Sequence, residues 1–239
     1  YGVRAANGVI LITTKRGAEG RVQVNYNGSY TLQTPGILPE FVSGYDWAKM
    51  KNEVAPGTYS AEALQKLQDG SDPDHYANTN WLDAVMRNAP MHQHHLSVTG
   101  GNKDTKFMAS VSFVDQKGIM IETGVKRISF RSNLDTKYKR FTFGLNVSGN
   151  KNALKTPGMD TTGDGGVLRR VGWFTRPTVP LMYSNGHYGY IDGSITDAEL
   201  VKNPLESMRS GYRLNDSWRF NGKAFAAMDI IDGLQFRTS

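Results

Sequence analysis

The sequence predicts a mainly β fold built from long, amphipathic, antiparallel strands. Apolar and polar residues alternate along several stretches, and a period of two indicates a strand with two different faces. The longest stretch, residues 21–32, is about twice the usual strand length of ~5–6 residues in globular proteins. Linkers at residues 101–105, 135–139 and 231–233 are short enough for hairpins, so neighbouring strands should be antiparallel.

The strands can be followed in order along the chain. A short apolar run at residues 9–14 lies between two glycines and predicts a buried strand. The strong alternation of residues 21–32 follows, and it resumes downstream over residues 96–99, 106–113, 127–134, 140–148 and 219–230. The polar faces of these segments carry the basic residues Arg21, Lys106, Arg127, Arg131, Arg140, Arg219 and Lys223.

Two segments interrupt the pattern. Residues from about 40 to 90 predict short helices, because Ser43, Ser60 and Asn80 each precede a helix-forming run and can cap its first turn. We expect a helical insert there, without a large core of its own. Residues from about 150 to 217 are rich in glycine, proline and asparagine and predict a long loop, with one short helix near residues 167–173.

Two architectures produce such strands. In a soluble sandwich the apolar face packs on a second sheet and the polar face meets water. In a transmembrane β-barrel the apolar face meets lipid and the polar face lines a wet lumen. Alternation cannot say which face is wet. Membrane-crossing strands need ~9–11 residues, and this length favours the barrel.

Composition excludes several classes of protein. The 239 residues include no cysteine, so a disulfide scaffold, a cysteine-ligated zinc site and a cysteine nucleophile are ruled out. The net charge is +6, but the basic residues are scattered, whereas a nucleic-acid-binding surface would cluster them with stacking aromatics. No catalytic constellation stands out, so we expect neither an enzyme nor a cofactor.

Several ordered motifs resemble one family. Residues 1–17 (YGVRAANGVILITTKRG) closely resemble the end of the plug domain in TonB-dependent outer-membrane transporters, in particular the SusC/RagA family of Bacteroidota. Downstream stretches resemble the same family in the same order. These stretches are residues 80–83 (NWLD), 96–102 (LSVTGGN), 115–119 (DQKGI) and 130–135 (FRSNLD).

The resemblance implies a layout and a function. Residues 1–17 would be the C-terminal end of the plug, and residues 18–239 the N-terminal part of a β-barrel, here expected as a fragment. The family's activity implies TonB-dependent import of oligosaccharides, or of peptides, across the bacterial outer membrane. The implied partners are a SusD/RagB-like surface lipoprotein and, through the plug, the TonB–ExbB–ExbD complex. A non-transporting surface β-protein is the alternative.

Candidate binding residues are few. The seven basic residues of the polar faces would line the lumen. Aromatic residues in the predicted loop suit the apolar faces of sugar rings, although an interfacial or packing role is the commoner one for any single aromatic residue there. They are Trp173, Tyr183, Tyr188 and Tyr190.

Two apparent metal motifs are incomplete. His92 and His94 share a strand face, yet no acidic third ligand is evident on that face. Residues 160–165 imitate the first half of a calcium loop, but Val171 stands where a bidentate glutamate is needed. We therefore expect no metal site.

Overall fold

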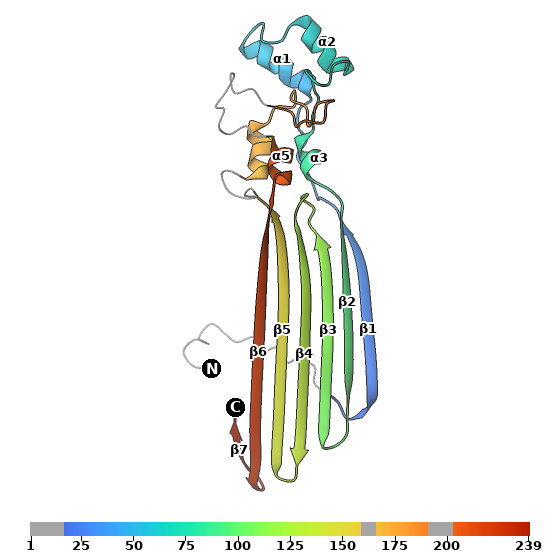
Figure 1. The fold of residues 1–239 in the computed structure, drawn as a ribbon, viewed down its shortest axis with the longest axis vertical. Coiled ribbons are helices and arrows are strands. Elements are labelled where there is room, and N and C mark those ends of the chain that lie inside the picture. The colour runs from blue at the N-terminus through green and yellow to red at the C-terminus, as the bar shows by residue number, and fades with distance from the viewer. Residues whose placement is uncertain (1–16, 159–165, 191–202) are drawn as a thin grey trace.

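The computed structural model describes residues 17–158, 166–190 and 203–239. Within them, seven strands form one antiparallel sheet in which each strand pairs with the next along the chain (Figure 1). This confirms the predicted mainly β, antiparallel fold. The strands are β1 (Gly20–Gln33), β2 (Ala89–Gly101), β3 (Thr105–Lys117), β4 (Gly124–Tyr138), β5 (Phe141–Pro157), β6 (Tyr212–Ile231) and β7 (Leu234–Thr238).

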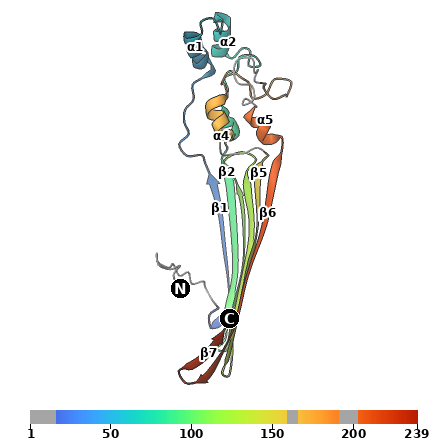
Figure 2. The same cartoon turned by 90° about the vertical axis from the view of Figure 1, so that its left-hand side faces the viewer.

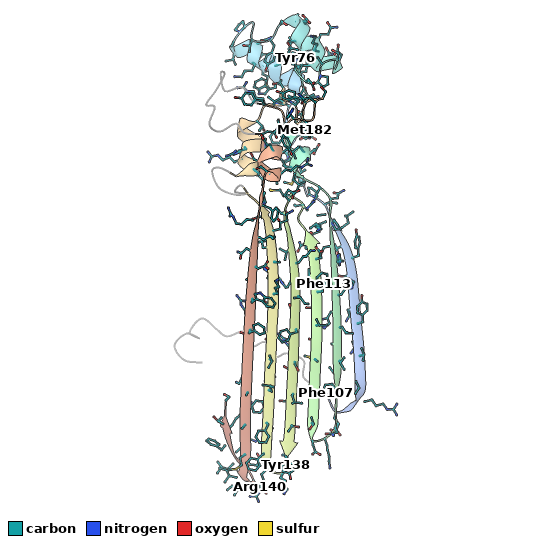
Figure 3. All side chains as sticks on the ribbon, viewed as in Figure 1. Tyr76, Phe107, Phe113, Tyr138, Arg140 and Met182 are labelled. Atoms are coloured by element: carbon teal, nitrogen blue, oxygen red, sulfur yellow. The ribbon has the colours of Figure 1, made fainter. Side chains whose placement is uncertain are left out.

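The two ends of the sheet differ in their connections. Residues 102–104, 139–140 and 232–233 form short hairpin turns at one end, where hairpins were predicted. Residues 34–88 and 158–211 form long connections at the other end, with the shorter 118–123 loop between them. We call the described parts of 34–88 and 158–211 the crown. Figure 3 shows Tyr76 and Met182 in the crown, and Tyr138 and Arg140 at the far end.

The predicted caps start the helices of the insert. Ser43 precedes α1 (Gly44–Val54), and its side chain accepts a hydrogen bond from the Asp46 amide. Ser60 does the same for α2 (Ala61–Asp69), which ends at Gly70 with a left-handed φ of 67°. Asn80 accepts from two amides at the start of α3 (Trp81–Val85). The insert therefore folds as its sequence predicts.

The region predicted as a loop over residues 150–217 is shorter than expected. β5 continues to Pro157, and β6 already begins at Tyr212. Lys151 and Asp216 interrupt the apolar row at these strand ends, so the alternation is broken while the hydrogen-bonded ladder continues. Between them lie α4 (Val167–Arg169), the π-helical turn η2 (Arg170–Phe174) and the unpredicted α5 (Pro204–Arg209). The helix expected near 167–173 is confirmed.

The crown has a core that the sequence analysis did not anticipate. Helices α3, α4, η2 and α5 pack together, although residues 34–88 and 158–211 are separated by four strands. The indole Nε1 of Trp81 donates to the Arg176 carbonyl at 2.8 Å, and Asp74 accepts two hydrogen bonds from Ser184. The buried residues of this core are Trp81, Leu82, Val85, Val167, Val171 and Met208.

The sheet itself is a single layer. Seen edge-on, the described residues place no second sheet over either face, and their helices sit at the crown end (Figure 2). Gly17, the first described residue, approaches the backbone of β3 so closely that an added Cβ would lie 2.4 Å from the Phe107 nitrogen. Glycine, which has no Cβ, permits this close approach. The predicted plug strand otherwise lies outside the described residues.

The shared crown core predicts a position-dependent loss of stability. Met208 is fully buried, so Met208→Ala should lower the free energy of crown unfolding by about 2–5 kcal/mol. Val54→Ala, at a residue that is 84% exposed on α1, should change it by less than about 0.5 kcal/mol. Limited proteolysis of the crown in denaturant measures both. Equal sensitivity of the two variants would contradict a shared core.

Candidate functional site

The polar faces of the strands form one concave surface. Register pairing places Asn25, Ser97, Ser110, Arg131, Ser148 and Asn221 in a single row across β1 to β6. The row on its crown side runs through Asn27, His95, Ser112, Ser129, Asn150 and Arg219. A hollow of about 990 Å³ lies over these rows, so the sheet curves toward its polar face.

The chemistry of this hollow is that of a hydrogen-bonding, positively charged surface. Amide and hydroxyl side chains dominate its lining, and within the described residues no carboxylate lines it. Arg131 and Arg219 supply the positive charge. Their Cα atoms lie two strands and two residues apart, a distance of about 12 Å from standard sheet spacings. The hollow can therefore bind a ligand rich in oxygen acceptors at two points.

The other predicted basic residues are distributed along the same sheet. Lys223 lines a smaller hollow of about 320 Å³ together with Arg131. Arg127 donates to the Asn152 side chain at 3.3 Å, and Lys106 lies opposite Asp135 in the register. Arg21 lies on β1 beside a register shift.

Arg140 differs from its expected position. It lies in the turn between β4 and β5 and not on a strand, because β4 ends at Tyr138 and β5 begins at Phe141. Its carbonyl accepts a hydrogen bond from the Asp229 amide at 2.8 Å. The sequence alternates between apolar and polar residues through this turn as well, and for that reason Arg140 was assigned to the polar face.

The opposite face of the sheet is apolar and uncovered. Val24, Phe143, Leu145 and Phe220 are each between 46% and 65% exposed. On β6 this apolar face extends from Met228 to Trp218, ten residue steps or about 34 Å along the strand. For a strand tilted by about 40° that is a band about 26 Å tall, close to the apolar band of ~25 Å on membrane barrels.

The predicted tyrosines of the crown make contacts within the crown. The Tyr183 hydroxyl accepts a hydrogen bond from the Tyr190 amide at 3.2 Å. Tyr188 forms an isolated antiparallel β-bridge with Met182. Tyr190 is 73% exposed. Trp173 belongs to η2, but its side chain lies outside the described part. These contacts place the tyrosines away from the hollow, so their binding role stays a prediction.

The histidines separate onto both faces. His95 lines the hollow, whereas His92 and His94 lie on the outer face, where His94 Nδ1 is 2.7 Å from the Tyr26 hydroxyl. Asp115 on β3 lies opposite His92, with its Oδ2 4.0 Å from His92 Nε2. The sequence pattern did not predict this acidic neighbour. Among the described residues, no group of three metal-ligating side chains is close enough to hold a metal ion. The calcium-like residues Asp160, Thr162 and Asp164 lie outside the described ranges.

The 118–123 loop is tied to β5 by an ion pair. Lys155 Nζ lies 2.8 Å from a Glu122 carboxylate oxygen, and this hydrogen bond, aided by Arg87 and Arg209, holds the pKa of Glu122 below its ordinary value of 4.5. The guanidinium of Arg87 donates to the carbonyls of Gly118 and Thr123. The loop is thus held by charge at the crown end.

The helices do not add a membrane segment. None of them, in the part of the chain that the structure describes, is long and apolar enough to cross a membrane.

Comparison with known proteins shows which proteins the chain is similar to. The chain is 30% identical over its whole length to TonB-dependent receptor P3 of Formosa agariphila, and 29% identical over 81% of its length to TonB-dependent receptor SusC of Bacteroides thetaiotaomicron. The chain is homologous to the TonB-dependent receptors. No family model matches it.

Solved structures agree with this homology. The RagAB peptide importer in the closed-closed state matches 99% of the chain with a TM-score of 0.74 at 23% identity, over 29% of the matched chain. The RagAB peptide transporter matches 99% with a TM-score of 0.71 at 25% identity, over 30% of its chain. The chain spans 22% of the P3 receptor and 18% of SusC, about a fifth of these curated relatives.

The Glu122–Lys155 pair predicts a pH-dependent loop. Because the pKa of Glu122 is lowered in the folded protein, the pair stabilises the loop above pH 4.5, and this contribution is lost as the pH falls through the lower folded value. Hydrogen exchange of residues 118–123 should therefore accelerate on acidification. Glu122→Gln should exchange faster at neutral pH and lose most of that acid response. An unchanged pH profile in the variant would contradict the pairing.

Proposed function

We propose that this chain forms the end of the plug and the first barrel strands of an outer-membrane receptor that imports oligomeric nutrients by a TonB-dependent mechanism. The observation that carries the proposal is a single-layer sheet with one apolar exposed face and one polar concave face. Lipid on the first side and water on the second satisfy both faces without a second sheet. Homology to TonB-dependent receptors supports the mechanism.

In this proposal the plug ends at about residue 17 and the barrel begins at about residue 18. The close approach of Gly17 to the β3 backbone supports the entry of the chain near the sheet at this point. The short turns then face the periplasm and the crown faces the exterior, because barrel proteins carry short periplasmic turns and long external loops. The crown would be the part that meets a SusD/RagB-like surface lipoprotein, and the plug would contact TonB–ExbB–ExbD.

The substrate we propose is an oligosaccharide. The hollow on the polar face offers amide, hydroxyl and guanidinium groups, which match the hydroxyl edges of sugars. Among the described residues Met108 alone contributes a large apolar side chain to its lining, because the Phe130 ring packs beside Phe220 on the outer face. Peptide import is the second candidate, favoured by the fold shared with the RagAB peptide importer. Transport needs no covalent chemistry, since it depends on different binding in open and closed states.

Arg219 offers a direct test in the full-length receptor. If its guanidinium contacts the passing substrate, Arg219→Gln removes a charge-assisted hydrogen bond of about 1.5–3 kcal/mol, and substrate affinity should fall about tenfold or more. Arg140→Gln, in the hairpin turn, is the matched control and should leave uptake unchanged. Radiolabelled oligosaccharides and peptides are compared in cells with and without TonB.

The outcomes of this uptake experiment distinguish glycan import, peptide import and the absence of transport. Uptake of glycan that requires TonB and weakens in Arg219→Gln supports the proposal. TonB-dependent uptake of peptide alone makes the receptor a peptide importer. No TonB-dependent uptake of either class would leave a non-transporting surface β-protein as the function.

A further inference from the structure

A band of ionic groups begins where the apolar outer face ends. On β5 and β6 the apolar residues reach Gly149 and Phe220, and the next outer-face pair is Lys151 beside Trp218. The Lys151 ammonium lies 5.2 Å from the Trp218 ring and 3.1 Å from an Asp216 oxygen. On β5 the outer face therefore changes from apolar to charged at Lys151, whereas on β6 Leu214 and Trp218 flank Asp216 on the same face.

This band carries more positive than negative charge. Its cations are Arg87, Lys117, Lys126, Lys151 and Lys155, and its anions are Asp115, Glu122 and Asp216, an excess of two positive charges. Asp115 is shared by two lysines, with Lys126 at 3.6 Å and Lys117 at 4.0 Å. One carboxylate cannot neutralise both ammonium groups, so the two lysines have capacity for a further anion.

The two lysines border a hollow in the outer surface. It has a volume of about 520 Å³ and lies between β3, β4 and the crown-side ends of β5 and β6. Lys117 and Lys126 are half or more exposed, at 50% and 62%. Tyr212 also lines the hollow, with Lys155 5.0 Å from its ring. The hollow is thus open to a ligand, and Lys117, Lys126 and Lys155 give it a positive charge.

We propose that this hollow binds the phosphate headgroup of an anionic lipid in the crown-side leaflet of the membrane. The apolar face directly below it, which includes Ile128 and Phe220, would then receive the acyl chains. A cationic hollow joined to an apolar surface matches an amphiphile, whereas a soluble phosphate would use only the hollow. The inference rests on the proposed membrane orientation of the barrel.

The test uses the full-length receptor purified in detergent. Native mass spectrometry should detect retained dioleoyl phosphatidic acid and little dioleoyl phosphatidylcholine, which has the same chains without a net negative charge. The double variant Lys117→Gln, Lys126→Gln removes two cations at the membrane surface. Its affinity for phosphatidic acid should fall about thirtyfold, from about 1 kcal/mol per lysine.

A matched control separates a site from a general charge effect. Lys103→Gln with Lys139→Gln removes the same charge from the turns at the opposite end of the sheet, outside the described hollow. It should retain phosphatidic acid like the parent receptor. Inorganic phosphate and glycerol 3-phosphate, added as soluble competitors, should not displace the lipid. The circular dichroism of all three proteins should be that of the same folded sheet.

Several results would overturn the proposal. They are equal retention of the two lipids, equal loss in both double variants, and displacement by soluble phosphate, which would indicate an anion site without lipid contact. Cell fractionation and uptake separate this failure from failure of the proposed function. A receptor that reaches the outer membrane and imports substrate, yet shows no preference for phosphatidic acid, refutes the lipid site alone.

Discussion

The structure depends on one constraint, which is that a single-layer sheet with two unlike faces needs two unlike surroundings. Large apolar side chains such as Phe220 and Val24 stand exposed on one face, while asparagine and serine rows line the other. Exposed apolar surfaces of this extent are rare on soluble monomers. Register preserves the separation, because a slip of one residue would move every side chain of a strand to the opposite face. The continuous ladder from β1 to β7 therefore keeps the apolar and the polar surface apart.

The long connections of the crown do not pack against a face of the sheet, so they need a hydrophobic core of their own. Their buried cluster joins α3 to α4, η2 and α5, segments from two separate connections. Hydrogen bonds such as that from Trp81 to the Arg176 carbonyl satisfy buried polar groups at the same place. The result is a small hydrophobic core above a sheet that has none of its own.

The sequence predicted the sheet well because alternation directly reports a strand with unlike faces, and it predicted α1 to α3 because Ser43, Ser60 and Asn80 are local capping signals. It failed at the crown-side ends of β5 and β6, where Lys151 and Asp216 interrupt the apolar row although pairing continues. It also missed the crown core, since no local pattern records that Val85 will meet Met208 far along the chain. Among the site residues, the alternation of the sequence correctly placed Arg131 and Arg219 on one face. It could not reveal that Arg140 occupies a turn.

The most direct test of the central claim is cysteine labelling of the two faces in the full-length receptor in native membranes. Single cysteines at Val24, Val111 and Val147 on the apolar face should react with a lipid-soluble maleimide and resist a membrane-impermeant one. Cysteines at Gln23, Ser112 and Asn146, next to them in sequence but on the polar face, should not react with the lipid-soluble reagent. That alternation is the predicted result. The reverse pattern, or equal labelling of both sets, would contradict a sheet with lipid on its apolar face.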